Sequence, residues 1–235
     1  MRIDVHAEVP EENNILRTLR VDLIGDRALT LEVKPWKAWD RAFVALMYIG
    51  IPAGESVRTQ RLHPTLAVVR EEGGALSLVA RVEIEEPRCR ELRPDQTELE
   101  LNLDGGDCPA MHLDLAPYRI SPTETALGLR TKTHEIFPAG ESEAEKLTLF
   151  RILGHTLKPI FSAEMMYSDE QRGPGDLTTS ESTLQISEQK TSGYFDLVLV
   201  ETTRSEKIFD TNYSRTKRTQ RRFSWQRGRY SPTRR

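Results

Sequence analysis

Apolar and polar positions alternate along much of this chain, and this alternation predicts short antiparallel strands joined by tight turns. Leu76, Leu78 and Ala80, for example, occupy every second position directly after a glycine-containing turn. Turns of this kind connect the two arms of a β-hairpin. We therefore predict three hairpins: residues 14–34 around Gly25-Asp26, residues 65–84 around Glu72-Gly73-Gly74, and residues 99–115 around Asp104-Gly105-Gly106-Asp107.

The second half of the chain has less regular patterns. Residues 126–136 predict one more strand. The nearly continuous apolar run from Phe195 to Val200 predicts a buried final strand, because a strand covered on both faces needs no polar positions. Residues 168–182 are rich in Ser, Asp, Gly and Thr, which is typical of a long loop. After Asp210 the hydrophobic pattern ends.

Two segments instead repeat apolar residues every three or four positions, which favours helices. The first follows Pro35 and ends at Gly50; its apolar stripe comprises Trp36, Trp39, Phe43, Leu46 and Met47. The second is expected to begin at Ser142, with Glu145 completing a capping box, and to end at Gly154 and Pro159. The predicted fold class is therefore α+β, with antiparallel β-hairpins packed with two principal helices.

Charge is distributed unevenly along the chain, although the formal net charge is only −3. Residues 211–235 hold nine of the 33 basic residues and no acid, so residues 1–210 hold 24 basic residues against all 36 acids. A strongly charged segment without an apolar pattern is expected to be disordered. We therefore predict an acidic, β-rich globular body over residues 1–210 and a basic disordered tail over residues 211–235.

The basic tail is the strongest functional signal in the sequence. Cationic side chains that neutralise phosphates release counterions, so the tail predicts salt-sensitive binding to nucleic acid or to an anionic membrane. Aromatic residues among them are expected to stack on bases or to enter a lipid headgroup layer. The predicted binding residues are Arg215, Lys217, Arg218, Arg221, Arg222, Trp225, Arg227, Arg229, Arg234 and Arg235.

Two serines in the tail have the surroundings of kinase sites. Ser224 follows Arg221-Arg222-Phe223, and Ser231 precedes Pro232. A phosphate on either serine would cancel part of the positive charge of the tail. Phosphorylation at Ser224 and Ser231 is therefore a predicted way to regulate polyanion binding.

Enzymatic alternatives rest on two groups of residues. Gly140-Glu141-Ser142-Glu143-Ala144 approximates a nucleophile elbow, but no histidine follows it beyond His155, so an N-cap role explains Ser142 better. Cys89, Cys108, His112 and His134 offer four ligands for zinc. Only Cys108 and His112 are closely spaced, and His112 alternates with apolar neighbours as a surface residue of a strand would. We therefore expect no metal, no cofactor and no catalytic residue.

The remaining composition bears on compartment. No apolar run approaches the roughly 20 residues that a membrane-spanning helix needs, and the first residues carry no apolar segment typical of a secretory signal. Two cysteines form no disulfide framework, which favours a reducing compartment. We expect an intracellular protein of the cytoplasm or nucleus of a host cell, or a virion component.

Three short motifs, Trp39-Asp40, Met47-Tyr48-Ile49-Gly50 and Ala53-Gly54, resemble the matrix proteins of rhabdoviruses. Those proteins similarly join a strand, a helix and an apolar segment to further antiparallel strands, and carry a basic disordered arm. The resemblance covers residues 15–115. It departs from the family pattern in that the basic segment is C-terminal and no Pro-Pro-x-Tyr or Pro-Thr-Ala-Pro budding motif occurs. The resemblance implies condensation of a nucleocapsid and association with a membrane.

Together these observations predict a non-enzymatic, viral matrix-like structural or assembly protein. Its expected partners are RNA or nucleoprotein, an anionic membrane, other copies of itself and a nuclear import receptor, with the basic tail as the binding element. The first alternative is a nucleic-acid-binding accessory or movement protein. The second is a small metal-dependent or hydrolytic enzyme.

Overall fold

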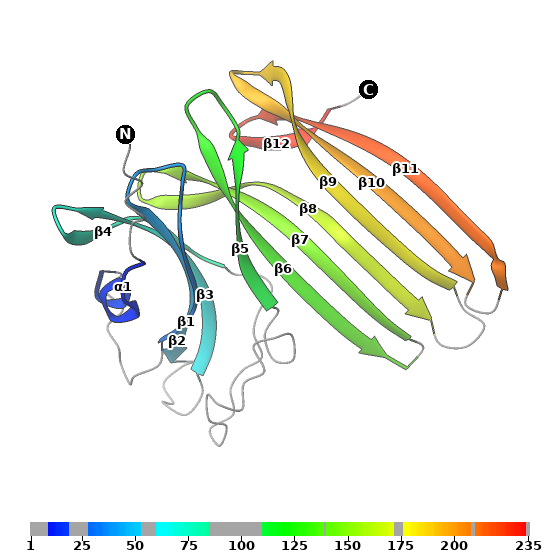
Figure 1. Ribbon diagram of the computed structural model, residues 1–235, viewed down its shortest axis with the longest axis horizontal. Helices are drawn as coiled ribbons and strands as arrows, with labels where there is room; N and C mark the ends of the chain where they lie inside the picture. The colour runs from blue at the N-terminus through cyan, green and yellow to red at the C-terminus, as the bar shows by residue number, and fades with distance from the viewer. Residues whose placement is uncertain are drawn as a thin grey trace, which may run out of the picture. The chain divides into compact units, whose positions relative to one another are not determined.

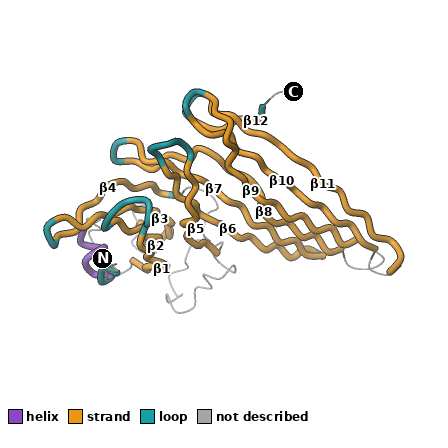
Figure 2. Tube along the Cα trace, turned by 45° about the horizontal axis from the view of Figure 1, so that its top comes forward, coloured by secondary structure: helices purple, strands orange, loops and turns teal. Residues whose placement is uncertain are grey.

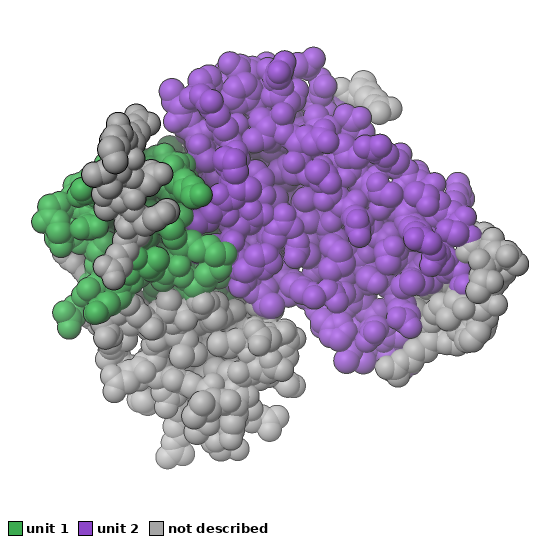
Figure 3. Space-filling model, viewed as in Figure 1, with its two compact units in different colours: residues 1–108, 152–158 green, residues 109–151, 159–235 purple. Residues whose placement is uncertain are grey.

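The computed structural model describes residues 9–18, 28–52, 60–84, 110–138, 140–171, 176–207 and 210–233. The chain forms two compact units, shown in different colours in Figure 3. Unit 1 contains residues 1–108 and 152–158, and unit 2 contains residues 109–151 and 159–235. The described residues of each unit lie mostly in β-strands, and Figure 2 shows how little of the described chain is helical.

In its described residues, unit 1 combines one short helix with four antiparallel strands. The helix α1 spans Glu12–Thr18, and the strands are β1 (Ala28–Pro35), β2 (Ala42–Pro52), β3 (Gln60–Glu72) and β4 (Ala75–Glu83), paired in chain order (Figure 1). Ile15 of α1 is fully buried in an apolar cluster with strand residues Phe43, Ala45, Met47, Ala67 and Val69. One buried residue thus anchors the helix on the sheet.

Unit 2 is a meander in which each strand pairs with the next along the chain. Its strands are β5 (Ala110–Arg119), β6 (Thr125–Phe137), β7 (Gly140–Leu153), β8 (Thr156–Gln171), β9 (Asp176–Thr191), β10 (Tyr194–Lys207), β11 (Asp210–Gln226) and β12 (Arg229–Pro232). Figures 1 and 2 both show the long strands β8 to β11 running side by side.

Residues 152–158, where β7 turns into β8, belong to unit 1. The backbone N–H of Arg81 in β4 donates to the carbonyl of His155 at 3.2 Å, and Arg81 pairs with Thr156 in parallel. The His155 ring nitrogen Nδ1 lies 3.2 Å from the carbonyl oxygen of Val79. A short segment from far along the chain therefore extends the sheet of unit 1 beyond β4.

The core of unit 2 contains one large apolar cluster, and further buried residues such as Leu127 and Leu129 lie outside this cluster in β6. The cluster draws buried side chains from β6, β7, β8, β10, β11 and β12: Ala126, Leu147, Leu149, Ile160, Phe161, Met165, Leu197, Leu199, Phe223, Trp225 and Tyr230, together with Tyr118 and Ile120 at the end of β5. Beyond this cluster the same strands continue with polar residues. Ser180 and Thr203, for example, lie on neighbouring strands with their hydroxyl oxygens 3.2 Å apart.

Both predicted helices are wrong, which overturns the α+β fold class. Residues 42–52 form β2, and each residue from Ala42 to Met47 is buried, so this strand is covered on both faces. A continuous apolar run can match a helical spacing by chance, which explains the error. Residues 140–153 form β7, in which Ser142 pairs with Glu135 of β6 instead of capping a helix.

The predicted disordered tail and long loop are also wrong. Residues 210–226 form β11 and residues 229–232 form β12. Within residues 168–182, the described part belongs to β8 and β9, because Ser and Thr are compatible with strands whose faces lie outside an apolar core. The run Phe195–Val200 is in a strand, β10, but β10 is not the last strand.

The predicted hairpins had mixed outcomes. The hairpin around Gly73-Gly74 is confirmed as β3 and β4, and the strand predicted over residues 126–136 is confirmed as β6. Residues 111–115 pair with β6 as part of β5, whereas residues 99–103 lie outside the described residues. The hairpin predicted over residues 14–34 is wrong at residues 14–18, which form the end of α1; residues 19–27, with the turn at Gly25-Asp26, lie outside the described residues, and the second arm is in β1.

Candidate polyanion-binding strand

The predicted binding residues lie in an edge strand of unit 2. On one side, β11 pairs with β10 from Phe223 opposite Leu197 to Asp210 opposite Lys207. On its other side, β12 pairs only with residues 223–226. Within the described part of the chain, residues 210–221 therefore have a strand partner on one side alone. Such an edge presents backbone N–H and C=O groups to a ligand.

Five basic side chains project from this edge on both faces of the sheet. Alternation places Arg215, Lys217 and Arg221 on the same face as the buried Phe223, and Arg218 and Arg222 on the opposite face. All five side chains are exposed. The sequence therefore supplies a row of cations whose directions are set by the strand itself.

Among the residues that the structure describes, these cations have few acidic partners. Arg221 Nη2 lies 3.6 Å from Glu201 Oε2, which also accepts a hydrogen bond of 3.2 Å from the Thr219 hydroxyl. Arg222 donates to the side-chain oxygen of Gln189, which is neutral. The Arg221 side chain is 56% exposed, so this ion pair is solvent-screened and weak. A phosphate can therefore replace the Glu201 carboxylate at Arg221, or bind beside it, at little cost in free energy.

Charge changes sign between β11 and the strands beside it. Strands β8 and β9 each carry three acids and one base, and β10 carries three acids and two bases. Strand β11 carries one acid and five bases. Positive potential is therefore concentrated on the edge strand, whereas the strands behind it are net acidic.

Trp225 belongs to the core of unit 2. Its ring is 7% exposed, stacks on Tyr194 with centroids 3.9 Å apart, and meets Tyr230 edge-on at 5.1 Å. Its ring surface is therefore occupied by core packing and not presented to bases or lipid, contrary to the prediction. Arg227 is exposed in the turn between β11 and β12, Arg229 is exposed at the start of β12, and Arg234 and Arg235 lie outside the described residues.

The two predicted phosphorylation sites face each other across the β11–β12 hairpin. Ser224 is 6% exposed, and its hydroxyl accepts a hydrogen bond of 3.1 Å from Gln226 Nε2. A kinase would have to open the hairpin to reach this hydroxyl, so the folded protein does not offer Ser224 as a site. Ser231 is half-buried.

An arginine and several aromatic rings hold the end of β11 in place. Arg151 Nη2 lies 3.0 Å from Glu124 Oε1 and 2.9 Å from Oε2, and its guanidinium carbon lies 5.4 Å from the ring centroids of Tyr194 and Trp225. Such contacts combine an ion pair with cation–π attraction. The Tyr230 hydroxyl donates to the Phe195 carbonyl at 2.8 Å, and burial, with help from the nearby Asp196 carboxylate, raises the pKa of Tyr230.

A second polar cluster joins β5, β6 and β7. Arg130 Nε donates to Asp114 Oδ2 at 2.7 Å, Arg130 also pairs with Glu145, and the Tyr118 hydroxyl donates to Asp114 Oδ2 at 2.8 Å. Burial alone would raise the pKa of Asp114, but hydrogen bonds from Arg130, Tyr118 and the Ala116 backbone outweigh it and lower this pKa. Burial and the hydrogen bond to Asp114 raise the pKa of Tyr118. Both carboxylates are committed to Arg130, which is a structural arrangement.

The residues considered for enzymatic chemistry do not come together in the described structure. Ser142 is half-buried in β7, His112 is exposed in β5, and His134 Nε2 pairs with Glu141 at 3.4 Å. Cys89 and Cys108 lie outside the described residues. Among the residues that the structure describes, no three His, Cys, Asp or Glu side chains are grouped in a way that could hold a metal ion. The same residues include no helix with the length and apolarity to cross a membrane.

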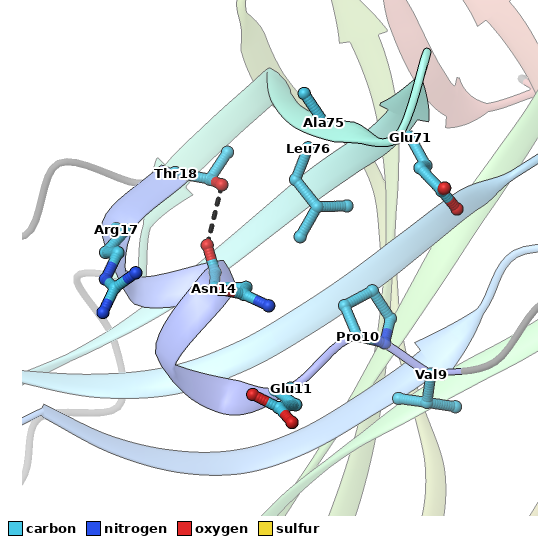
Figure 4. A pocket seen from close by; sticks show the side chains of 10 residues that line it. Val9, Pro10, Glu11, Asn14, Arg17, Thr18, Glu71, Ala75 and Leu76 are labelled. Atoms are coloured by element: carbon cyan, nitrogen blue, oxygen red, sulfur yellow. Dashed lines mark hydrogen bonds between the residues drawn. The ribbon is translucent and has the colours of Figure 1, made fainter.

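Unit 1 has a groove of about 660 Å³ between α1 and the β3–β4 hairpin, drawn in Figure 4. Its walls carry charges of both signs, from Glu11, Arg17 and Glu71. The Thr18 hydroxyl donates to the Asn14 carbonyl at 2.8 Å, so this polar group of the groove wall is hydrogen-bonded within α1. The groove therefore lacks the single-sign charge that distinguishes β11.

Comparisons of the chain with protein-family models, with curated protein sequences and with solved structures find no match.

Proposed function

We propose that this protein is a non-enzymatic binding and assembly protein that contacts nucleic acid through β11. The observation that supports the proposal is the row of five exposed cations on one ordered edge strand beside net acidic strands. Cations that contact phosphates displace the condensed counterions of a nucleic acid, and this gain in entropy drives binding. Because the strand fixes the side-chain directions, little of that gain is lost in ordering the protein.

Nucleic acid is favoured over a membrane because, among the β11 residues whose side chains the structure describes, the cations are exposed and the large apolar residues are buried. Phe223, Trp225 and Tyr230 are buried in the core. The exposed large apolar side chains among the described residues are Val9, Trp39, Ile136 and Leu153, and none of them lies on β11. Stable peripheral membrane binding usually combines a basic patch with buried apolar area. A linear polyanion needs only the row of cations.

The proposal does not depend on a viral matrix identity. That resemblance included a helix after the first strand, and the structure has β2 over this region. Matrix-type assembly, self-association and nuclear import stay predictions. An accessory nucleic-acid-binding protein would use the same strand in the same way.

The test is binding of single-stranded RNA and of anionic vesicles across a salt series. The full chain is compared with Arg215→Gln/Lys217→Gln/Arg221→Gln, because removal of β11 would also remove Phe223 and Trp225 from the core. A matched control removes three exposed lysines elsewhere, Lys37→Gln/Lys146→Gln/Lys158→Gln. For five phosphate contacts with a single strand, the slope of log K against log salt is about −3.5.

The triple β11 variant is expected to flatten this slope by about 2, and the control is expected to leave it unchanged. Equal slopes in wild type and the β11 variant would refute the proposal, as would binding to vesicles alone. Circular dichroism and thermal midpoints of each variant check that the exposed substitutions leave the fold intact.

A further inference from the structure

We infer that the ligand of β11 is a single-stranded nucleic acid lying along the strand edge and bound through its phosphates, whatever its base sequence. This inference rests on the proposed function and names the form of nucleic acid that the same strand accepts. It follows from three features of unit 2: the spacing of the cations, the acids on the neighbouring strands and the burial of the aromatic rings.

The cations form a linear array on both sides of a narrow edge. Side chains on one face of an antiparallel strand repeat every two residues, about 6.8 Å apart. Arg215 and Arg222 mark the ends of the array, which is about 24 Å long. Phosphates along an extended nucleic-acid strand repeat at a comparable spacing. A single polymer chain that follows the edge therefore meets cations from both faces in turn, and the unpaired backbone N–H groups between them.

A duplex would meet acids instead. The major groove of B-DNA is about 8.5 Å deep, and neighbouring strands of a sheet are about 4.8 Å apart. If β11 entered this groove edge-on, the phosphates at its two lips would lie level with β10 and β9. Those strands are net acidic: Glu201 lies on one face, and Glu181 and Glu206 lie on the other together with Arg204, which pairs with Glu206. The deep major groove of duplex RNA is too narrow to admit side chains.

Docking of a duplex flat against one face uses fewer cations. One face of β11 offers Arg215, Lys217 and Arg221, and the other offers Arg218 and Arg222. Either orientation leaves the remaining cations pointing away from the duplex. It also brings phosphates of the duplex over the net acidic strands behind β11. The edge-following single strand is the one arrangement that uses all five cations and avoids those acids.

The bases of the ligand are not read. Base-stacking sites need exposed aromatic rings, and among the side chains that the structure describes on β11 and β12 the aromatic rings, those of Phe223, Trp225 and Tyr230, are turned into the core. Recognition of base edges needs side chains placed in a groove or around an unstacked base. The five cations instead lie in a row that matches a repeating charge. Binding is therefore expected to be indifferent to sequence.

The experiment is fluorescence anisotropy of full-length protein with labelled RNA of about 12 nucleotides, within the range of known single-strand site sizes. The probes are oligo(U), a mixed-sequence single strand and the blunt duplex of that mixed strand. Two β11 variants separate the faces: Arg215→Gln/Lys217→Gln/Arg221→Gln and Arg218→Gln/Arg222→Gln. The control is Lys37→Gln/Lys146→Gln/Lys158→Gln.

Single strands are expected to bind about tenfold or more tightly than the duplex, to differ little from each other, and to lose affinity with both β11 variants. A duplex that binds as well as the single strand would overturn this inference and leave the proposed function standing. Loss confined to one face would overturn the edge-following arrangement. Absence of binding to any RNA would overturn both the inference and the proposed function.

Discussion

Replacement of Trp225 by alanine distinguishes a core role for this ring from a ligand-binding role. In the structure the ring stacks on Tyr194 at 3.9 Å, with an interplanar angle of 18°, and meets Tyr230 at 80°. The guanidinium of Arg151 lies 5.4 Å from its centroid. Trp225→Ala therefore removes one of the aromatic contacts that join the last hairpin to the rest of the cluster.

The expected loss is large compared with the stability of a typical domain. Truncation of a buried tryptophan to alanine lowers the free energy of unfolding by about 3–5 kcal/mol. Each aromatic pair that is lost contributes about 0.5–1.5 kcal/mol. Domains unfold with a free energy of about 5–15 kcal/mol. We therefore expect Trp225→Ala to lower the urea midpoint of unit 2 markedly, and Trp225→Phe to lower it less.

The assay is urea unfolding followed by far-ultraviolet circular dichroism, combined with RNA titration at low temperature where both proteins are folded. Trp39→Ala is the matched control, because Trp39 is 40% exposed. It is expected to lose no more than about 1 kcal/mol. If Trp225→Ala unfolds like wild type but binds RNA weakly, Trp225 contacts the ligand and the packing argument fails.

Three further substitutions test the packing and electrostatics. Gly128→Ala places a Cβ 2.8 Å from the Asp114 carbonyl oxygen, and is expected to cost about 1–3 kcal/mol by denaturant unfolding; an unchanged midpoint would show that β5 moves freely. Thr65→Val replaces a buried hydroxyl that has no hydrogen-bond partner among the described residues, and is expected to raise the unfolding free energy by about 1 kcal/mol. Because the folded-state pKa of Asp114 is lowered, its contribution is fully present above about pH 4 and is lost as pH falls through the folded-state pKa. Unfolding between pH 2 and 5 should therefore be less pH-dependent in Asp114→Asn than in wild type, and parallel curves would contradict the role of the Arg130 pair.

Local patterns predicted the fold where alternation within a strand and the chemistry of the turn agree. The hairpin around Gly73-Gly74 is such a case, because Leu76, Leu78 and Ala80 alternate directly after the turn, although residues 64–69 of the first strand are buried on both faces. They failed at Ala42–Met47, where burial on both faces removes the alternation that distinguishes a strand from a helix. They failed again at Ser142, since a capping-box pattern is short enough to occur inside a strand.

The candidate site was only partly predictable. The basic residues of β11 were recognised from composition, but their order as an edge strand was not. A signal for a hairpin was present in the sequence, because Phe223, Trp225 and Tyr230 flank Arg227-Gly228. In the structure these two turn residues have positive φ angles (49° and 85°), as a two-residue hairpin turn requires. The density of charge around these residues favoured disorder. Contacts with Arg151 and Tyr194, distant in sequence, decide the outcome, and no local pattern reports them.

The discontinuity of unit 1 has a consequence for how the chain is made. Arg81 of β4 precedes its partner Thr156 by 75 residues. Ribosomes add about 5–20 residues per second, so several seconds pass between the synthesis of β4 and the synthesis of residues 152–158, which complete its sheet. During that interval the nascent chain carries an incomplete sheet, which a chaperone or a neighbouring nascent chain can reach. Neither unit can be expressed faithfully by cutting the gene at a single point.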